Sequence, residues 1–263
     1  DAVALGHDDL AFLQYTGGTT GVAKGAQLSH GNMVANVLQV GAWMSPNLHE
    51  GQETLILPLP MYHVFALTGA LSFFSQGAQA VLIANPRDMP DFLKVLGSAP
   101  FTAIIGVNTL FRAMLDAPGF AAIDLRPLKL AVAGGMAVQQ VVAHRWKERA
   151  GVPLVEGYGL TETSPVAIAN PVTIQEWSGQ IGVPVPSTEA AILDDDGGPI
   201  PLGEVGEICL RGPQVMKGYW NQPQESAKVF TPNGWLRTGD MGVMDEHGSI
   251  RITDRKKDMI VVS

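Results

Sequence analysis

The chain has 263 residues, of which 46% are hydrophobic and 16% charged, a composition typical of a folded protein with a buried core. Its net charge of −8 argues against a nucleic acid as the main partner. A single cysteine, Cys209, excludes an internal disulfide and indicates a reducing compartment. Residues 1–9 are acidic where a signal peptide would be basic, so we expect a cytoplasmic protein.

The first two-thirds of the chain alternate between apolar runs, which predict strands, and segments of helical period. The expected strands are 10–15, 54–57, 79–84, 102–107, 128–133 and 153–156, and the expected helices are 29–44, 64–74, 90–96, 109–115 and 138–149. This order predicts an α/β fold with a mostly parallel sheet layered with helices. Ligands bind such sheets at the carboxyl ends of the strands. We therefore expect a site formed by residues 16–25, by Gly134 and Gly135, and by the loop after Glu156.

Residues 54–86 carry no Asp, Glu, Lys or Arg and imitate a membrane span. Polar residues and Gly77 interrupt the stretch, and a spanning helix needs about 20 predominantly apolar residues in a row. A buried helix followed by a buried strand is the favoured interpretation.

Beyond Gly179 the helical pattern fades. Short strands at 190–193, 206–211, 242–244 and 249–253 alternate with turn clusters rich in Asp and Gly. Such spacing predicts antiparallel hairpins in a small distorted barrel or folded sheet. We expect the α/β part to cover residues 1–175 and the antiparallel part to cover 176–252. The cysteine falls in the expected strand 206–211, which predicts a buried structural residue.

A glycine-rich loop occupies residues 15–25, YTGGTTGVAKG. Glycines let backbone N–H groups converge on one point, while threonine hydroxyls and a lysine add donors and positive charge. The loop predicts a phosphate site, with a flexible turn as the alternative. It is not a Walker A loop, because Lys24 lies between Ala23 and Gly25. The expected phosphate-binding residues are Thr16, Gly17, Gly18, Thr19, Thr20, Gly21 and Lys24.

A second motif, GYGLTET at 157–163, follows the expected strand 153–156. Tyr158, flanked by Gly157 and Gly159, would present one ring face to a flat base. Thr161 offers a hydroxyl to a phosphate, and Glu162 offers a carboxylate to Mg²⁺ held by substrate phosphates. The alternative is a strand-to-loop turn with a buried tyrosine.

Two further residues are ambiguous by themselves. Asp240, in the triplet Thr238–Asp240, could accept hydrogen bonds from ribose hydroxyls, but alone the triplet indicates only a turn. His63 lies among apolar and aromatic residues, where a lone histidine is more often packed in the core than catalytic.

Together these segments resemble the ordered core motifs of adenylate-forming enzymes, the superfamily of acyl-CoA synthetases, luciferases and peptide-synthetase adenylation domains. The matching segments are 15–25, 57–63, 134–136, 158–163, 235–240 and 254–259, and the resemblance runs through essentially the whole chain. Within the superfamily, residues 85–88, 106–111 and 212–216 resemble bacterial long-chain fatty acid–CoA ligases.

The resemblance implies that a fatty acid carboxylate attacks the α-phosphate of Mg·ATP, and that coenzyme A then displaces AMP from the acyl-AMP. Residues 16–24 would hold the β- and γ-phosphates, Thr161 would contact phosphate, and Glu162 would hold Mg²⁺. His63 would lie beside the acyl and phosphate site. By motif position Gly134, Gly135, Gly157 and Tyr158 would frame the adenine, and Asp240 and Arg255 would bind the ribose.

The resemblance also leaves several points open. Residues 64–71 and 107–111 are expected to line an acyl tunnel, with Leu67 where some relatives carry a gating tryptophan. Residues 253–263 match a hinge to a C-terminal domain, so we expect a fragment with little turnover alone. Medium-chain or aryl acids, or a non-catalytic nucleotide-binding module, are the alternatives. Peripheral membrane association and the oligomeric state, including a homodimer, stay open.

Overall fold

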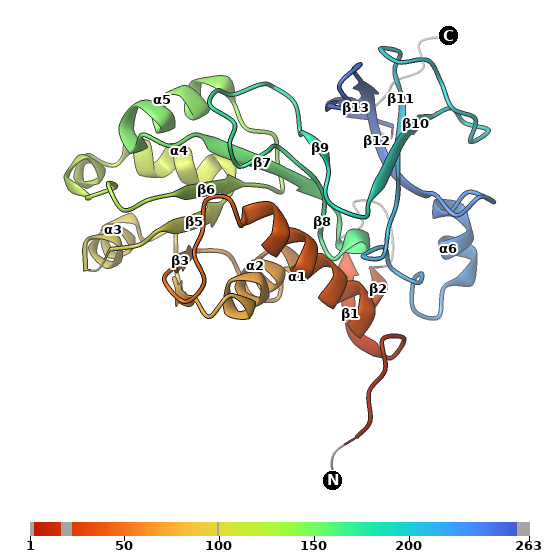
Figure 1. Ribbon diagram of the computed structural model, residues 1–263, viewed down its shortest axis with the longest axis horizontal. Helices are drawn as coiled ribbons and strands as arrows, with labels where there is room; N and C mark the ends of the chain where they lie inside the picture. The colour runs from red at the N-terminus through yellow and green to blue at the C-terminus, as the bar shows by residue number, and fades with distance from the viewer. Residues whose placement is uncertain (1–2, 17–22, 99, 257–263) are drawn as a thin grey trace. The chain divides into compact units, whose positions relative to one another are not determined.

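The computed structural model describes residues 3–16, 23–98 and 100–256 (Figure 1). The chain forms two compact units. Unit 1 comprises Asp1–Asn36, Gly159–Ile168 and Gln180–Ser263, and unit 2 comprises Val37–Tyr158 and Ala169–Gly179. The division into residues 1–175, 176–252 and 253–263 stays a prediction.

Unit 2 contains five strands of a seven-stranded sheet, which run parallel in the order β4-β3-β5-β6-β7. Its strands are β3 (Thr54–Leu57), β4 (Gln79–Leu82), β5 (Ala103–Gly106), β6 (Leu130–Ala133) and β7 (Leu154–Gly159). The helices are α1 (His30–Met44), whose first turns belong to unit 1, α2 (Val64–Ser75), α3 (Met89–Ser98), α4 (Asn108–Asp116), η1 (Pro118–Ala122) and α5 (Gln140–Ala150). The predicted parallel sheet layered with helices is confirmed.

The alternation of side chains along the strands builds a hydrophobic core on each face of this sheet. Ile56 and Ile104 point to one face, where they join a cluster with α3, α4 and α5 around the fully buried Trp146. Leu55 and Leu57 point to the other face and pack with α2 and the end of α1. Burial on both faces explains why these strands are continuous apolar runs.

Unit 1 contains a four-stranded antiparallel sheet with the order β10-β11-β12-β13. Its strands are β10 (Glu189–Leu193), β11 (Gly206–Arg211), β12 (Leu236–Met244) and β13 (Ile250–Arg255). The predicted antiparallel part is confirmed, although β12 begins six residues before the expected 242. Shorter elements are η2 (Thr161–Thr163), β8 (Val166–Ala169, which ends in unit 2), β9 (Val183–Pro184) and α6 (Pro223–Val229).

The first strand differs from the prediction. β1 (Leu10–Thr16) pairs antiparallel with β2 (Lys24–Ser29), from Leu10 opposite Ser29 to Thr16 opposite Lys24. Phe12 and Tyr15 are exposed. The prediction that residues 10–15 form a buried strand of the parallel sheet is therefore wrong. A short apolar run does not distinguish a strand of a hairpin from a strand of a parallel sheet. The strands on either side of the glycine-rich segment pair with each other.

Two other expectations concern buried residues. Segment 54–86 forms β3, α2 and β4, but the predicted burial of the last strand is wrong, because β4 is an edge strand and its residues Gln79 and Leu82 are exposed. No helix in the described part of the chain is long and apolar enough to cross a membrane. Cys209 is buried in β11, and burial raises the pKa of its thiol to about 12. A thiol held protonated in this way is structural, as the sequence predicts.

Candidate nucleotide-binding site

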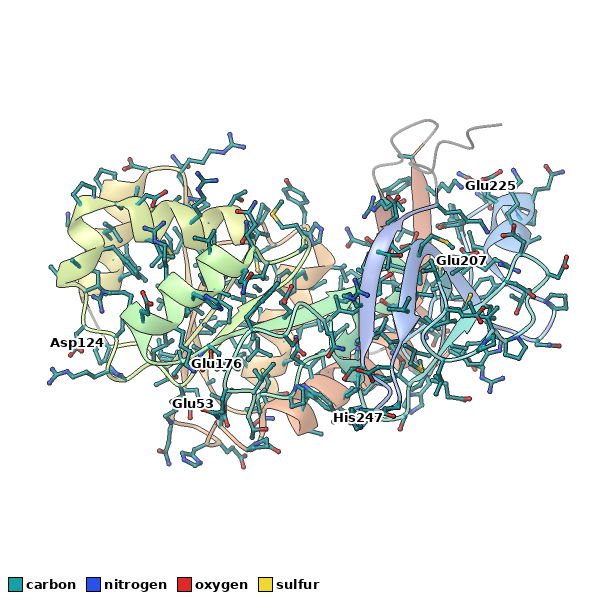
Figure 2. The ribbon with its side chains drawn as sticks, turned by 90° about the horizontal axis from the view of Figure 1, so that it is seen from above. Glu53, Asp124, Glu176, Glu207, Glu225 and His247 are labelled. Carbon is teal, nitrogen blue, oxygen red and sulfur yellow. The ribbon has the colours of Figure 1, made fainter. Side chains whose placement is uncertain are left out.

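Lys24 is the first residue of β2 and lies between a carboxylate and an aromatic ring. Its Nζ is 2.5 Å from Glu225 Oε2 on α6 and 5.1 Å from the centroid of the Tyr219 ring (Figure 2 labels Glu225). The expected phosphate residues Gly17, Gly18, Thr19, Thr20 and Gly21 lie outside the described residues. The pairing of Thr16 with Lys24 sets the two ends of that loop opposite each other.

Tyr219 connects Lys24 to the predicted metal carboxylate. Segment 217–220 runs beside β2, where Gln27 N donates to Gly218 O (2.9 Å) and Trp220 N donates to Gly25 O (2.8 Å). This pairing brings the Tyr219 ring to the ammonium group of Lys24. The Tyr219 hydroxyl donates to Glu162 Oε1 at 2.6 Å. Lys24, Tyr219 and Glu162 therefore form one connected group.

The backbone around Glu162 is held on both sides. Met216 N donates to the carbonyl of Glu162 (2.8 Å), and Leu160 N donates to Thr163 Oγ1 (2.9 Å). Ser164 ends the turn in the left-handed region, with φ at 67°, and its hydroxyl donates to Gln214 O at 2.8 Å. Thr161 opens this turn with a half-buried side chain.

Glu162 suits a magnesium ion that takes most of its ligands from a substrate. One oxygen accepts the tyrosine hydroxyl, and no described residue donates a hydrogen bond to the other. No group of three or more His, Cys, Asp or Glu side chains suited to a metal occurs among the described residues. Mg²⁺ is commonly held by one or two carboxylates together with phosphate oxygens and water. A single half-buried carboxylate fits that arrangement.

Asp240 and Arg255 form the second polar group of unit 1. They lie opposite each other in β12 and β13, and Arg255 Nε is 3.2 Å from Asp240 Oδ1. The side chain of Asp240 is 6% exposed, whereas that of Arg255 is 68% exposed. Carboxylate oxygens and a guanidinium so placed would hydrogen-bond to neighbouring hydroxyls. The two residues predicted to bind ribose are thus adjacent.

The residues predicted to frame the adenine lie in unit 2. Gly134 follows β6, and an added Cβ there would lie 3.1 Å from the Phe65 ring and 3.2 Å from Gly157 O. Gly135 has φ at +75°, which favours glycine. Tyr158 is half-buried near the end of β7. Gly134 and Gly135 therefore lie against the carboxyl end of β7, the edge of the sheet where the sequence predicts a ligand site.

Glu156 and Asn108 also hold this loop, and sequence reasoning missed that role. Val138 N donates to Glu156 Oε1, and Gln139 N donates to Asn108 Oδ1, each at 3.0 Å. Burial raises the pKa of Glu156 above its usual value. Both side chains are buried, and their hydrogen bonds fix the segment after Gly135.

His63 does not pack in the core, so that interpretation is wrong. It is exposed and precedes α2, where its Nδ1 accepts a hydrogen bond from Phe65 N at 3.2 Å. A side chain that caps the first turn of a helix satisfies an N–H group left free by the helix. The catalytic role of His63 stays a prediction.

The described candidates of unit 1 are thus Thr16, Lys24, Thr161, Glu162, Asp240 and Arg255. Those of unit 2 are His63, Gly134, Gly135, Gly157 and Tyr158. Sequence reasoning missed Tyr219 and Glu225. The motif GYW at 218–220 was available as a signal, but only its contact with β2 gives it a role.

A nucleotide-binding protein of the adenylate-forming class is expected to have these features: the layered parallel sheet, the lysine–tyrosine–carboxylate group and the aspartate–arginine pair. The family model described as AMP-binding enzyme matches residues 1–220, and the chain belongs to this family.

Several known proteins are similar to the chain. The long-chain-fatty-acid–CoA ligase of Escherichia coli O6:H1 is 56% identical over 97% of the chain and 46% of the relative. A feruloyl-CoA synthase from an Amycolatopsis species is 35% identical over 98% of the chain and 52% of the relative. The crystal structure of ATP-bound MatB from Rhodopseudomonas palustris superposes with a TM-score of 0.85 at 31% identity, covering 97% of the chain and 50% of MatB. The chain spans about half the length of the curated relatives it matches.

Proposed function

We propose that this chain is the nucleotide- and acyl-binding part of an ATP-dependent long-chain fatty acid–CoA ligase. The observation that carries the proposal is the connected group of Lys24, Tyr219 and Glu162. In this group the ammonium would bind phosphates and the carboxylate would hold Mg²⁺. The 56% identity to a protein named long-chain-fatty-acid–CoA ligase supports the acyl class.

In the first half-reaction a fatty acid carboxylate oxygen attacks the α-phosphorus of ATP, and pyrophosphate leaves. Lys24, with Thr16 and the loop that follows it, would bind the departing phosphates, and Thr161 would donate to a phosphate oxygen. Glu162 would hold Mg²⁺, which neutralises charge on the phosphates. Such transfers depend on positioning and charge neutralisation more than on a protein nucleophile.

In the second half-reaction the thiol sulfur of coenzyme A attacks the acyl carbonyl carbon, and AMP leaves. Asp240 and Arg255 would bind the ribose hydroxyls throughout, while Gly134, Gly135, Gly157 and Tyr158 would frame the adenine. His63 would lie beside the reacting carboxylate. Residues 64–71 and 107–111 would line the acyl tunnel, and residues 253–263 would form the hinge to a C-terminal domain. We place the enzyme in the cytoplasm, with fatty acid supplied at the inner face of the membrane.

Exchange of labelled pyrophosphate into ATP, measured on the full-length protein with palmitate, octanoate, acetate and ferulate, tests the proposal. We expect exchange with palmitate to exceed exchange with the other acids, and Glu162→Gln to abolish it. A preference for octanoate or ferulate would favour a medium-chain or aryl ligase. ATP binding without exchange for any acid would favour a non-catalytic nucleotide-binding module.

A further inference from the structure

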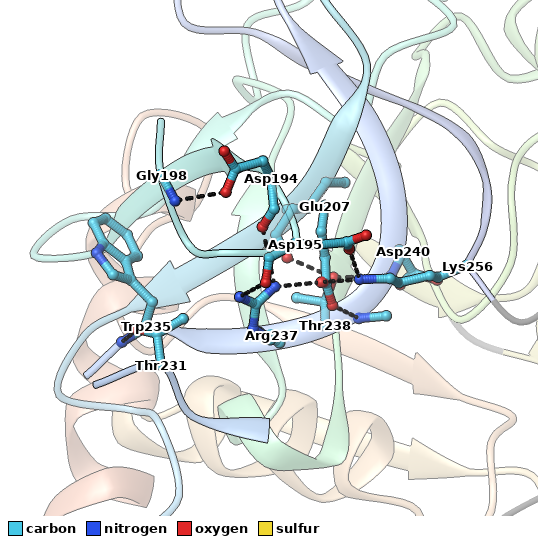
Figure 3. A network of polar contacts seen from close by, with 12 residues as sticks. Asp194, Asp195, Gly198, Glu207, Thr231, Trp235, Arg237, Thr238, Asp240 and Lys256 are labelled. Atoms are coloured by element: carbon cyan, nitrogen blue, oxygen red, sulfur yellow. Dashed lines mark hydrogen bonds and ion pairs between the residues drawn. The ribbon is translucent and has the colours of Figure 1, made fainter. Parts of the chain in front are cut away.

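Glu207 in β11 is a buried carboxylate outside the group that contains Lys24. Its Oε2 accepts from Arg237 Nη1 at 2.9 Å and from Lys256 Nζ at 3.0 Å, and its Oε1 accepts from Gly239 N at 3.0 Å (Figure 3). Only 4% of its side chain is exposed. A charge buried so deeply persists only when it is paired and hydrogen-bonded, and here both oxygens are.

The partners of Glu207 flank the aspartate–arginine pair in the chain. Gly239 precedes Asp240 in β12, and Lys256 follows Arg255 at the end of β13. Lys256 N also donates to Gly239 O at 2.9 Å. One carboxylate thus links the residue before the aspartate to the residue after the arginine.

The regular strand pairing does not supply this link by itself. The register between β11 and β12 shifts between Glu207 and Cys209, and the register between β12 and β13 shifts between Met241 and Gly242. Gly239 adopts a positive φ of 76°, which directs its N–H to the Glu207 carboxylate. At these irregular points a side chain replaces part of the backbone ladder.

We propose that Glu207 is the positioning residue that holds Asp240 and Arg255 in place for the ribose of the nucleotide. It acts through Gly239 and Lys256 and does not touch the ligand. The inference rests on the proposed function, because that function assigns the ribose to Asp240 and Arg255. The alternative is that Glu207 only stabilises the antiparallel sheet.

The affinities of the full-length protein for ATP and for 2′,3′-dideoxy-ATP separate these roles, because the second nucleotide lacks both ribose hydroxyls. We expect the unaltered protein to prefer ATP. Glu207→Gln should weaken ATP binding by about tenfold, the effect of losing one hydrogen bond to a charged group, and should leave dideoxy-ATP binding within about twofold. Glu189→Gln is the matched control, since Glu189 pairs with Arg211 (2.6 Å) in the same sheet and is exposed. It should change neither affinity.

A second variant keeps the proposal testable if Glu207→Gln does not fold. Lys256→Met removes one hydrogen-bond partner of Glu207, and the Lys256 side chain is 36% exposed. The substitution should weaken ATP binding by about threefold and leave the affinity for dideoxy-ATP unchanged. Circular dichroism and thermal melting establish that each variant is folded. The positioning role would be overturned if either variant is folded and still prefers ATP over dideoxy-ATP by the same factor as the unaltered protein. Equal affinities in the unaltered protein would overturn the ribose assignment as well.

Discussion

Replacing Tyr219 by phenylalanine isolates the hydrogen bond that connects it to Glu162. The ring near Lys24 is kept, and only the hydroxyl 2.6 Å from Glu162 Oε1 is lost. A hydrogen bond to a charged group contributes about 1.5–3 kcal/mol, and we expect about 1.5 kcal/mol because Glu162 is half-buried and water can replace the donor. Burial, with Glu162 nearby, raises the pKa of Tyr219 well above its usual value, so the effect should not change between pH 6 and pH 9.

A double-mutant cycle with Glu162→Ala, which removes the acceptor, measures this coupling directly. The free energy of unfolding is determined by urea denaturation for the unaltered protein, for Tyr219→Phe, for Glu162→Ala and for the double variant. We expect a coupling of about 1 kcal/mol or more, together with a loss of Mg²⁺-dependent ATP affinity of about threefold in Tyr219→Phe. A coupling near zero would show that the hydroxyl does not hold the carboxylate, and the reasoning would be wrong.

Three further substitutions test other contacts. Lys129→Met should destabilise the protein by about 3 kcal/mol in urea denaturation, because Glu53 is 1% exposed and pairs with Lys129 at 2.7 Å. Burial alone would raise the pKa of Glu53, but hydrogen bonds, of which that from Lys129 is the largest, lower it below the ordinary value of 4.5. The ionised Glu53 therefore contributes to the free energy of unfolding above that value, and the contribution is lost in a pH titration as the pH falls. Glu225→Gln should tighten ATP binding about twofold to fivefold by calorimetry, since phosphates no longer compete with a carboxylate for Lys24. Gly159→Ala should prevent folding, judged by circular dichroism, because a Cβ would lie 1.7 Å from a backbone oxygen; a native spectrum would contradict this.

The parallel sheet could be predicted because its inner strands β3, β5 and β6 are buried on both faces. Leu55, Ile56 and Leu57 are all buried, so β3 appears in the sequence as an apolar run. β2 was missed, since it buries small residues such as Gly25 and Ala26 that carry no hydrophobic signal. Without β2, the strand before it could not be recognised as half of a hairpin.

The candidate site was predictable only where a short segment carries its own chemistry. Glu162 and Asp240 are marked by neighbouring glycines and threonines. Glu225 is 201 residues away from Lys24, and no local pattern signals such a contact. The same holds for Glu207, whose partners become visible only when β11, β12 and β13 are paired.

The discontinuous make-up of unit 1 has a consequence for exchanging parts between relatives. Lys24, Glu162 and Asp240 come from its three separate stretches, Asp1–Asn36, Gly159–Ile168 and Gln180–Ser263. Tyr219, in the third stretch, contacts Lys24 of the first stretch and donates to Glu162 of the second. Transplanting any one contiguous stretch from another enzyme would therefore leave at least one of these contacts with partners from two different parents. A hybrid that takes both contacts from one parent has to inherit all three stretches from it.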